Sequence, residues 1–334
     1  MGETPRRQFI VGTSALVAGS FAAAQKATAP FRIGILQVGS EPVFKSTNEA
    51  FLDGLRDRGY VVGQNLIADF RYGDGWDPLP ALADELIARN PDCLAGSEVT
   101  GIVMKSRTST IPIVLLTSAD PVVYGLVQSL GRPGTNVTGM SGNMYVLAAK
   151  QVEILAEMVP GMSRLSLLTD SFQPPQGSPY FGRPDAWETA VRQAAQAKGL
   201  TLLVVKAGNA DELRAAFASI KADRVEGLVV ANNALVLRLY ADILGAIAQL
   251  RLPAIFGNRG FVRAGALLSY GANGRENYRY AAKFVDLILK GAKPGDLPVE
   301  QVSKFELYVN RKAARELGLA IPQSILVRAD EVIE

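Results

Sequence analysis

The sequence contains no histidine and a single cysteine, Cys93, and both shortages narrow the chemistry open to the chain. Without histidine, Ser-His-Asp and Cys-His arrangements cannot be assembled, and histidine-based zinc sites are excluded with them. Cys93 lies in the apolar segment PDCLAG, which predicts a small buried hydrophobe. We therefore expect no metal, no cofactor and no intrachain disulfide, so core burial alone must hold the fold together.

Excess charge is also lacking. The 35 basic and 32 acidic side chains leave a formal charge of only +3, and no basic run occurs outside the N-terminal segment. Nucleic acid is therefore not an expected partner. Because 48% of the residues are apolar and 20% are charged, with both signs interspersed, the chain is expected to fold into a globule.

No apolar run is long enough to cross a membrane. Val11–Ala24 falls short of the roughly 20 apolar residues that a spanning helix needs, and it is rich in Gly, Ser and Ala. The order of a basic pair, Arg6 and Arg7, then the apolar stretch 9–21 and then Ala22–Ala24 is typical of an export signal.

The arginine pair followed by Gln8, Phe9 and Ile10 resembles the bacterial twin-arginine signal. We expect residues 1–24 to be removed after Ala24, because a cut after Ala29 would place Pro30 at the new N-terminus. The mature chain is then predicted to be periplasmic.

The remaining part of the chain, about 310 residues, exceeds one ordinary core and suggests two lobes. Short apolar runs alternate with amphipathic segments of helical length along its whole course. The predicted strands are 31–38, 65–72, 92–96, 111–117, 164–170, 200–207, 225–231, 252–257 and 304–310. The predicted helices are 43–58, 78–89, 98–107, 122–130, 146–158, 184–198, 210–222, 234–250, 276–290 and 311–317.

This alternation predicts an α/β fold with two doubly wound parallel-sheet lobes. The first lobe is expected to comprise 25–142 and 270–302, and the second 143–269 and 303–334. The hinge is then expected near Gly142, Ser269–Gly271 and Ser303–Phe305.

Polar residues follow the apolar runs, where ligands bind in open parallel sheets. The candidate ligand-binding residues are Ser40, Ser97, Ser118, Asp120 and Ser141 in the first lobe, and Asp170, Asn232, Asn233, Asn258 and Tyr270 in the second. Each residue taken singly is equally typical of a helix cap or turn. Together they predict a polar cleft between two facing sheet edges.

The segment IPIVLLTSADPVVYGLVQSLGRPGTNVTGMSG resembles the substrate-binding proteins of ABC transporters, whose pattern runs I-P-V-V-F, D-P, G-L-V, R-P-G-G-N and V-T-G. The similarity extends over AFLDGLRDRGYVVGQN, FVRAGALLSYG, AAKFVDLILKGAKPGDLPVEQ and the end of the chain. The resemblance implies a type I periplasmic binding fold. It also implies a protein that closes over a small solute and docks on ABC permease subunits. We expect this protein to be a monomer.

Some relatives in that family bind aromatic amino acids, and the resemblance places their cleft segments here. Their G-T-P-A loop matches Gly96-Ser97-Glu98, their D-P loop Asp120-Pro121, their D-N pair Asn232-Asn233 and their G-x-E segment Gly257-Asn258-Arg259. The acidic positions of the last two segments are an amide and an arginine in this chain. An ammonium group would lose partners there.

The expected ligand is therefore a small organic solute with a carboxylate or similar acceptor and an apolar or aromatic portion, and an amino acid is the second choice. The acceptor is expected against hydroxyl groups and helix-start amides at Ser40, Ser97 and Ser118. Asn232, Asn233 and Asn258 would bind a neutral polar group at the other end. The aromatic residues Phe172, Tyr180 and Phe181 either stack on the ligand or hold their own loop in place.

Two other functions remain open from the sequence. A protein of this fold can present its closed state to a sensory receptor instead of a permease. An envelope enzyme could use Asp120 and Asp170 as acid and base, although both follow strands as turn caps do.

Overall fold

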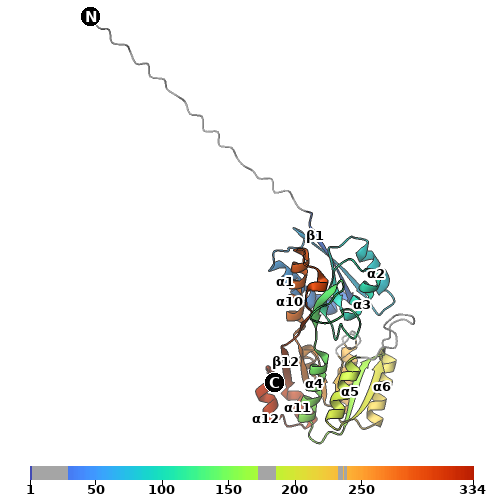
Figure 1. Ribbon diagram of the computed structural model, residues 1–334. Helices are drawn as coiled ribbons and strands as arrows, with labels where there is room; N and C mark the ends of the chain where they lie inside the picture. Colours follow the sequence, from blue (N-terminus) through green and yellow to red (C-terminus); the bar gives the residue numbers. More distant parts are fainter. Residues whose placement is uncertain (2–28, 172–185, 232–235, 237–238) are drawn as a thin grey trace.

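The computed structural model describes residues 1, 29–171, 186–231, 236 and 239–334. It shows two α/β lobes stacked one above the other, with the connecting segments between them (Figure 1). Apart from Met1, the expected export signal lies outside the described residues, as do Phe172, Tyr180 and Phe181. Asn232 and Asn233 lie outside them as well.

The first lobe is built on a sheet in the order β11-β5-β4-β3-β1-β2, and all of its pairs are parallel. Its strands are β1 (Phe31–Val38), β2 (Leu66–Gly73), β3 (Cys93–Ser97), β4 (Ile113–Thr117), β5 (Val137–Ser141) and β11 (Glu300–Gln301). Its helices are α1 (Glu41–Arg56), α2 (Leu79–Ile87), α3 (Glu98–Arg107), α10 (Gly274–Leu289) and the short 3-10 turn η1 (Pro294–Asp296).

The second lobe is built on a sheet in the order β13-β12-β10-β9-β8-β6-β7, in which β10 and β12 form the antiparallel pair. Its strands are β6 (Arg164–Asp170), β7 (Thr201–Ala207), β8 (Gly227–Val230), β9 (Ala254–Phe256), β10 (Leu268–Ala272), β12 (Phe305–Asn310) and β13 (Glu331–Ile333). Its helices are α4 (Met144–Met158), α5 (Ala186–Ala197), α6 (Ala210–Ala222), α8 (Tyr240–Leu250), α9 (Arg259–Arg263), α11 (Arg311–Leu317) and α12 (Gln323–Arg328).

Both sheets are buried on both faces, as the near-continuous apolar strands predict. In β1, Ile33 and Ile35 join the cluster beneath α1 and α10, whereas Leu36 joins the cluster beneath α2 and α3. The second lobe divides in the same way into two clusters. The predicted α/β class with two doubly wound, parallel-dominated sheets is confirmed.

Helix α10 follows a second-lobe strand but packs against α1 of the first lobe, and a glycine permits the approach. A side chain at Gly54 would begin 2.2 Å from the carbonyl oxygen of Arg279, so only glycine fits there. Phe51 and Phe284 are fully buried in the cluster beneath these two helices. Residues far apart in the sequence thus form one layer of the first lobe.

Three short segments cross between the lobes: 142–143 from β5 to α4, Asn273 from β10 to α10, and 302–304 from β11 to β12. Strands β5, β10 and β11 end at the carboxyl edges of their sheets, and the antiparallel β12 begins at the same edge of the second sheet. Because these segments span at most about 10 Å, the carboxyl edges of the two sheets face each other.

The second crossing lies slightly later than the sequence boundary at residue 270, because β10 continues in the second sheet to Ala272. The predicted helix 122–130 is wrong. The amides of Leu126 and Val127 both donate to the carbonyl of Pro121, and Gly125 has φ +64°, so the segment forms turns. The sequence patterns also did not predict the short elements α9, α12, β11 and β13.

Within the described ranges, no helix combines the length and the apolar character that membrane crossing requires. Cys93 is fully buried, and burial raises the pKa of its thiol. An inert packing role for this residue follows.

Candidate functional site

The carboxyl edge of the first sheet is organised around Glu98, the first residue of α3. Its Oε2 accepts hydrogen bonds from the Ser118 hydroxyl at 2.7 Å and from the backbone amides of Ala119 at 2.8 Å and Asp120 at 3.0 Å. Its Oε1 accepts no hydrogen bond from any described residue. One oxygen is therefore fixed and the other is left available.

Burial raises the pKa of Glu98 to about 7. The three hydrogen bonds lower the pKa, and the neighbouring charge of Asp120 raises it, but burial is the largest effect. At neutral pH, Glu98 therefore populates both its ionised and its protonated form.

Ser40 and Ser97 lie at helix starts, as the sequence predicts. They precede α1 and α3, and neither side chain makes a capping hydrogen bond. No helix follows Ser118, however. The amides of Ala119 and Asp120, which were expected to be free for a ligand acceptor, already donate to Glu98, so this part of the expectation is wrong.

Asp120 and Ser141 serve the same turn. Asp120 Oδ1 accepts hydrogen bonds from the amides of Val122 and Val123, so this carboxylate caps the turn. Ser141 is buried, with its hydroxyl 3.5 Å from the carbonyl of Ala119. The amide of Gly142 donates to the Ser118 carbonyl at 2.6 Å, which ties the first crossover to the same edge.

The second sheet's carboxyl edge carries Asp170 at the end of β6 and Asn258 before α9. The Asn258 side chain caps α9 by accepting a hydrogen bond from the amide of Gly260 at 2.8 Å. Asp170 and Asn258 thus belong to one edge.

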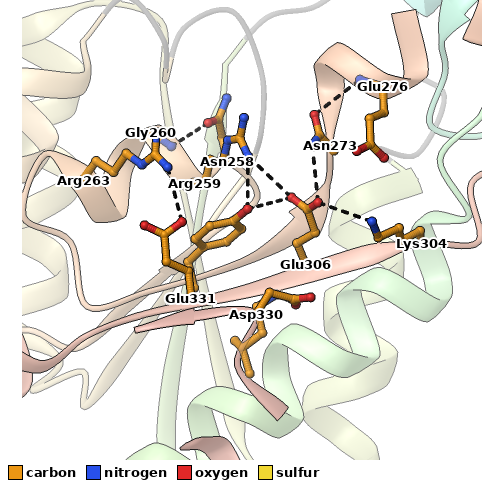
Figure 2. Close-up of polar contacts among 12 residues, drawn as sticks. Asn258, Arg259, Gly260, Arg263, Asn273, Glu276, Lys304, Glu306, Asp330 and Glu331 are labelled. Atoms are coloured by element: carbon orange, nitrogen blue, oxygen red, sulfur yellow. Dashed lines mark hydrogen bonds and ion pairs between the residues drawn. The ribbon is translucent and has the colours of Figure 1, made fainter. Parts of the chain in front are cut away.

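Arg259, the next residue, reaches toward Glu306 and Tyr308 of β12 (Figure 2). Its Nη1 donates to the Tyr308 hydroxyl at 3.1 Å, and that hydroxyl donates to Glu306 Oε2 at 2.8 Å. The guanidinium lies 5.9 Å from the centre of the Tyr308 ring and makes a 3.9 Å ion pair with Glu306. Its Nε and Nη2 make no hydrogen bond with the described residues.

Glu306 also connects two of the crossovers. Its Oε1 accepts a 3.4 Å hydrogen bond from Asn273 Nδ2 and lies 3.9 Å from Lys304 Nζ, as Figure 2 shows. Asn273 is the second crossover, and Lys304 belongs to the third. A contact at Arg259 is therefore linked to the hinge through a single buried carboxylate.

Tyr270 is turned toward the α4 and α12 side of the second sheet. Burial, then the charges of Asp330 and Glu153, raise the pKa of its phenol. Its ring lies 5.7 Å from that of Phe305, which packs against the first-lobe core. These contacts indicate a packing role at the hinge and give no support to ligand contact.

Exposed apolar side chains adjoin the first edge and the first crossover: Val122, Val123, Tyr145 and Val146. They offer apolar surface beside the polar groups. Among the described residues, no group of three or more His, Cys, Asp or Glu side chains could hold a metal ion.

Two residues of these edges, Glu98 and Arg259, were not among the predicted ligand contacts. For Arg259 the sequence signal was the replacement of an acidic position in a matched family segment, which was interpreted as a loss of partners for an ammonium group. Glu98 lies in the segment matched to the G-T-P-A loop, and its side chain was given no role there. The side chains newly present at those positions are the chemically informative ones.

Comparisons with known proteins give a family match and a curated relative. The sequence model described as "ABC transporter substrate binding protein" matches residues 32–333. A tyrosine-binding protein from Clostridioides difficile is 24% identical over 289 residues, which are 86% of this chain and 81% of the relative.

Solved structures show the same fold. A conserved domain protein from Vibrio cholerae superposes with a TM-score of 0.81 at 27% identity, over 90% of this chain and 99% of that one. An ABC domain in complex with L-Trp from Streptococcus pneumoniae superposes with a TM-score of 0.82 at 25% identity, over 91% and 100% of the two chains.

Proposed function

The chain belongs to the ABC transporter substrate-binding protein family, and we propose that it captures a small organic solute between its two facing sheet edges and delivers it to an ABC permease. The observation that carries this proposal is the family match over 32–333, on a fold whose three crossovers bring those edges together. Ligand contact with both edges would favour the closed arrangement of the lobes.

The proposed ligand carries a carboxylate and an apolar or aromatic portion. Arg259 has donors that no described residue uses and that could bind a carboxylate, and Val122, Val123, Tyr145 and Val146 supply apolar surface. The tyrosine-binding relative and the L-Trp complex support an aromatic amino acid as a candidate within this class.

We place the mature protein outside the cytoplasm, as a monomer, after removal of residues 1–24. The support is the order of Arg6 and Arg7, the apolar stretch and Ala24 in the sequence, together with the family. The permease would recognise the relative orientation of the two lobes, because only that orientation differs between the ligand-free and the ligand-bound protein.

A catalytic role for Asp120 and Asp170 receives no support from the geometry. Asp120 is committed to capping the amides of Val122 and Val123, which is the structural role typical of an Asp in a turn. The relatives are binding proteins, and we propose the same for this chain.

Thermal-shift screening of the mature protein tests the proposal. The solutes would be amino acids, small carboxylates, amides and aromatic compounds, each at millimolar concentration. A solute at 100 times its dissociation constant adds about 2.7 kcal/mol of stability. One class should raise the melting temperature in a saturable way. A flat response across all classes would contradict the proposed function.

A further inference from the structure

The two oxygens of the Glu98 carboxylate differ in their contacts. Oε2 accepts three hydrogen bonds, from the Ser118 hydroxyl and two successive backbone amides, whereas Oε1 has no partner among the described residues. Three donors converging on one oxygen hold the position and the orientation of the group. The free oxygen therefore has a defined place at the edge where a solute is expected.

Glu98 is part-buried and its Oε1 remains open to solvent, so a ligand can reach this oxygen. A charged N–H donor is the best complement of a carboxylate oxygen. The surroundings do not supply that donor. The charged neighbour that acts on Glu98 is Asp120, which is itself an acid. The first edge thus carries two neighbouring acids, and Glu98 makes no ion pair with a described basic side chain.

The second edge offers hydrogen-bond donors. Arg259 keeps Nε and Nη2 without partners in the described structure. The acids that act on it, Glu306 and Glu331, are also paired with Lys304 and Arg263. A solute that touches both edges thus meets an acceptor on one side and donors on the other.

Building on the solute-binding role proposed above, we propose that Glu98 Oε1 binds a cationic nitrogen of the solute, so that the ligand is a zwitterion such as an α-amino acid. Its ammonium group lies toward the first lobe and its carboxylate toward Arg259. This orientation reverses the sequence expectation, which placed the acceptor group of the ligand against the first lobe.

A purely structural role for Glu98, fixing the turn at 118–120, is the competing explanation. The two roles differ in which ligands would bind more weakly after the Glu98 carboxylate is lost. Loss of a structural carboxylate weakens every ligand of the site, whereas loss of an ammonium contact weakens ligands that carry the ammonium group.

The test compares Glu98→Gln with the unaltered mature protein by calorimetry and thermal shift. The probes are matched pairs with and without the amine: L-tryptophan with indole-3-propionate, L-tyrosine with 3-(4-hydroxyphenyl)propionate and L-leucine with 4-methylpentanoate. Glutamine keeps an oxygen for the three donors but removes the charge. Glu85→Gln, an exposed helix acid paired with Arg71, controls for the charge change alone.

We expect at least one amine to bind the unaltered protein and its desamino partner to bind about 10- to 100-fold more weakly. Glu98→Gln should remove most of that difference, with the desamino affinity held within about twofold, and Glu85→Gln should change neither. Equal weakening of both members of a pair would overturn the assignment. Stabilisation by uncharged solutes or simple carboxylates alone would also overturn it, while leaving the solute-receptor function intact.

Discussion

The two facing sheet edges of this molecule hold their charged side chains in different ways. At the first edge, Glu98 is held by a hydroxyl and two amides of one turn, all within 22 positions of it in sequence. At the second edge, Arg259 is held by Tyr308, 49 positions away, and through it by Glu306, which also contacts two crossovers. The first edge is a rigid local anchor, and the second is built into the hinge.

Substitution of Glu306 should have the largest effect on stability. Glu306→Ala leaves Asn273 and the Tyr308 hydroxyl without their buried acceptor and Arg259 without its paired charge, so we expect a loss of about 3 kcal/mol in the free energy of unfolding. Urea denaturation measures it. Glu331→Gln, at an exposed acid paired with Arg263, is the control and should stay within about 0.5 kcal/mol. Equal effects of the two variants would show that the second edge is not organised by Glu306.

The backbone beside Glu306 tolerates no side chain on the neighbouring strand. Gly271 pairs with Glu306 in the β10-β12 register, and a Cβ there would begin 2.0 Å from the carbonyl oxygen of Gly257. We expect Gly271→Ala to cost about 2 kcal/mol or more, measured by urea denaturation. Gly245→Ala, in α8 with open space around it, should instead stabilise by about 0.5 to 1 kcal/mol. A Gly271→Ala variant as stable as the parent would contradict this account of the edge.

Glu98, at the first edge, should make the free energy of unfolding depend on pH. The folded pKa of Glu98, about 7, lies above its ordinary value of 4.5, so between these values the folded state binds a proton that the unfolded state does not. This group therefore stabilises the fold increasingly as the pH falls through 7, and the effect levels off below about 4.5.

Between pH 7.5 and 5.5 the contribution of Glu98 should rise by about 2 kcal/mol. The quantity to measure is the difference in unfolding free energy between the parent and Glu98→Gln at each pH, which cancels the other carboxylates. A difference that does not change with pH would contradict the raised pKa.

Removal of the Arg259 charge at the second edge should have the smallest of these effects, and it should appear in ligand affinity. Arg259→Gln should weaken L-tryptophan binding about tenfold, because one charge-assisted hydrogen bond to the carboxylate is lost. Binding of tryptamine, which lacks the carboxylate, should change by less than twofold. Calorimetry with both probes decides it, and an equal loss for both would show that Arg259 does not contact the carboxylate.

The sequence predicted the larger elements well because their apolar periodicity and their end signals agree. The predicted bounds of α3, α6 and α11 match the structure. Helix α1 differs by two residues at each end, α4 by two at the start, and α10 by two at the start and one at the end. The predicted helix at 122–130 failed where Pro121 and Gly125 impose turns on an apolar segment.

The site was less predictable, for a physical reason. Strand ends identify which residues reach an edge, but not which hydrogen bonds are already satisfied there. Ser118 and the amides after it were expected to meet a ligand, yet Glu98 occupies them. The Arg259 cluster joins positions 33 to 49 residues apart, and no local pattern reveals that association.

In the proposed function a solute bridges the two sheet edges and holds the lobes closed. Small-angle X-ray scattering of the mature protein can detect this closure during a titration with the solute that gives the largest thermal shift. The radius of gyration should fall with the same midpoint as binding measured by calorimetry. A radius of gyration that stays constant at saturation would contradict it.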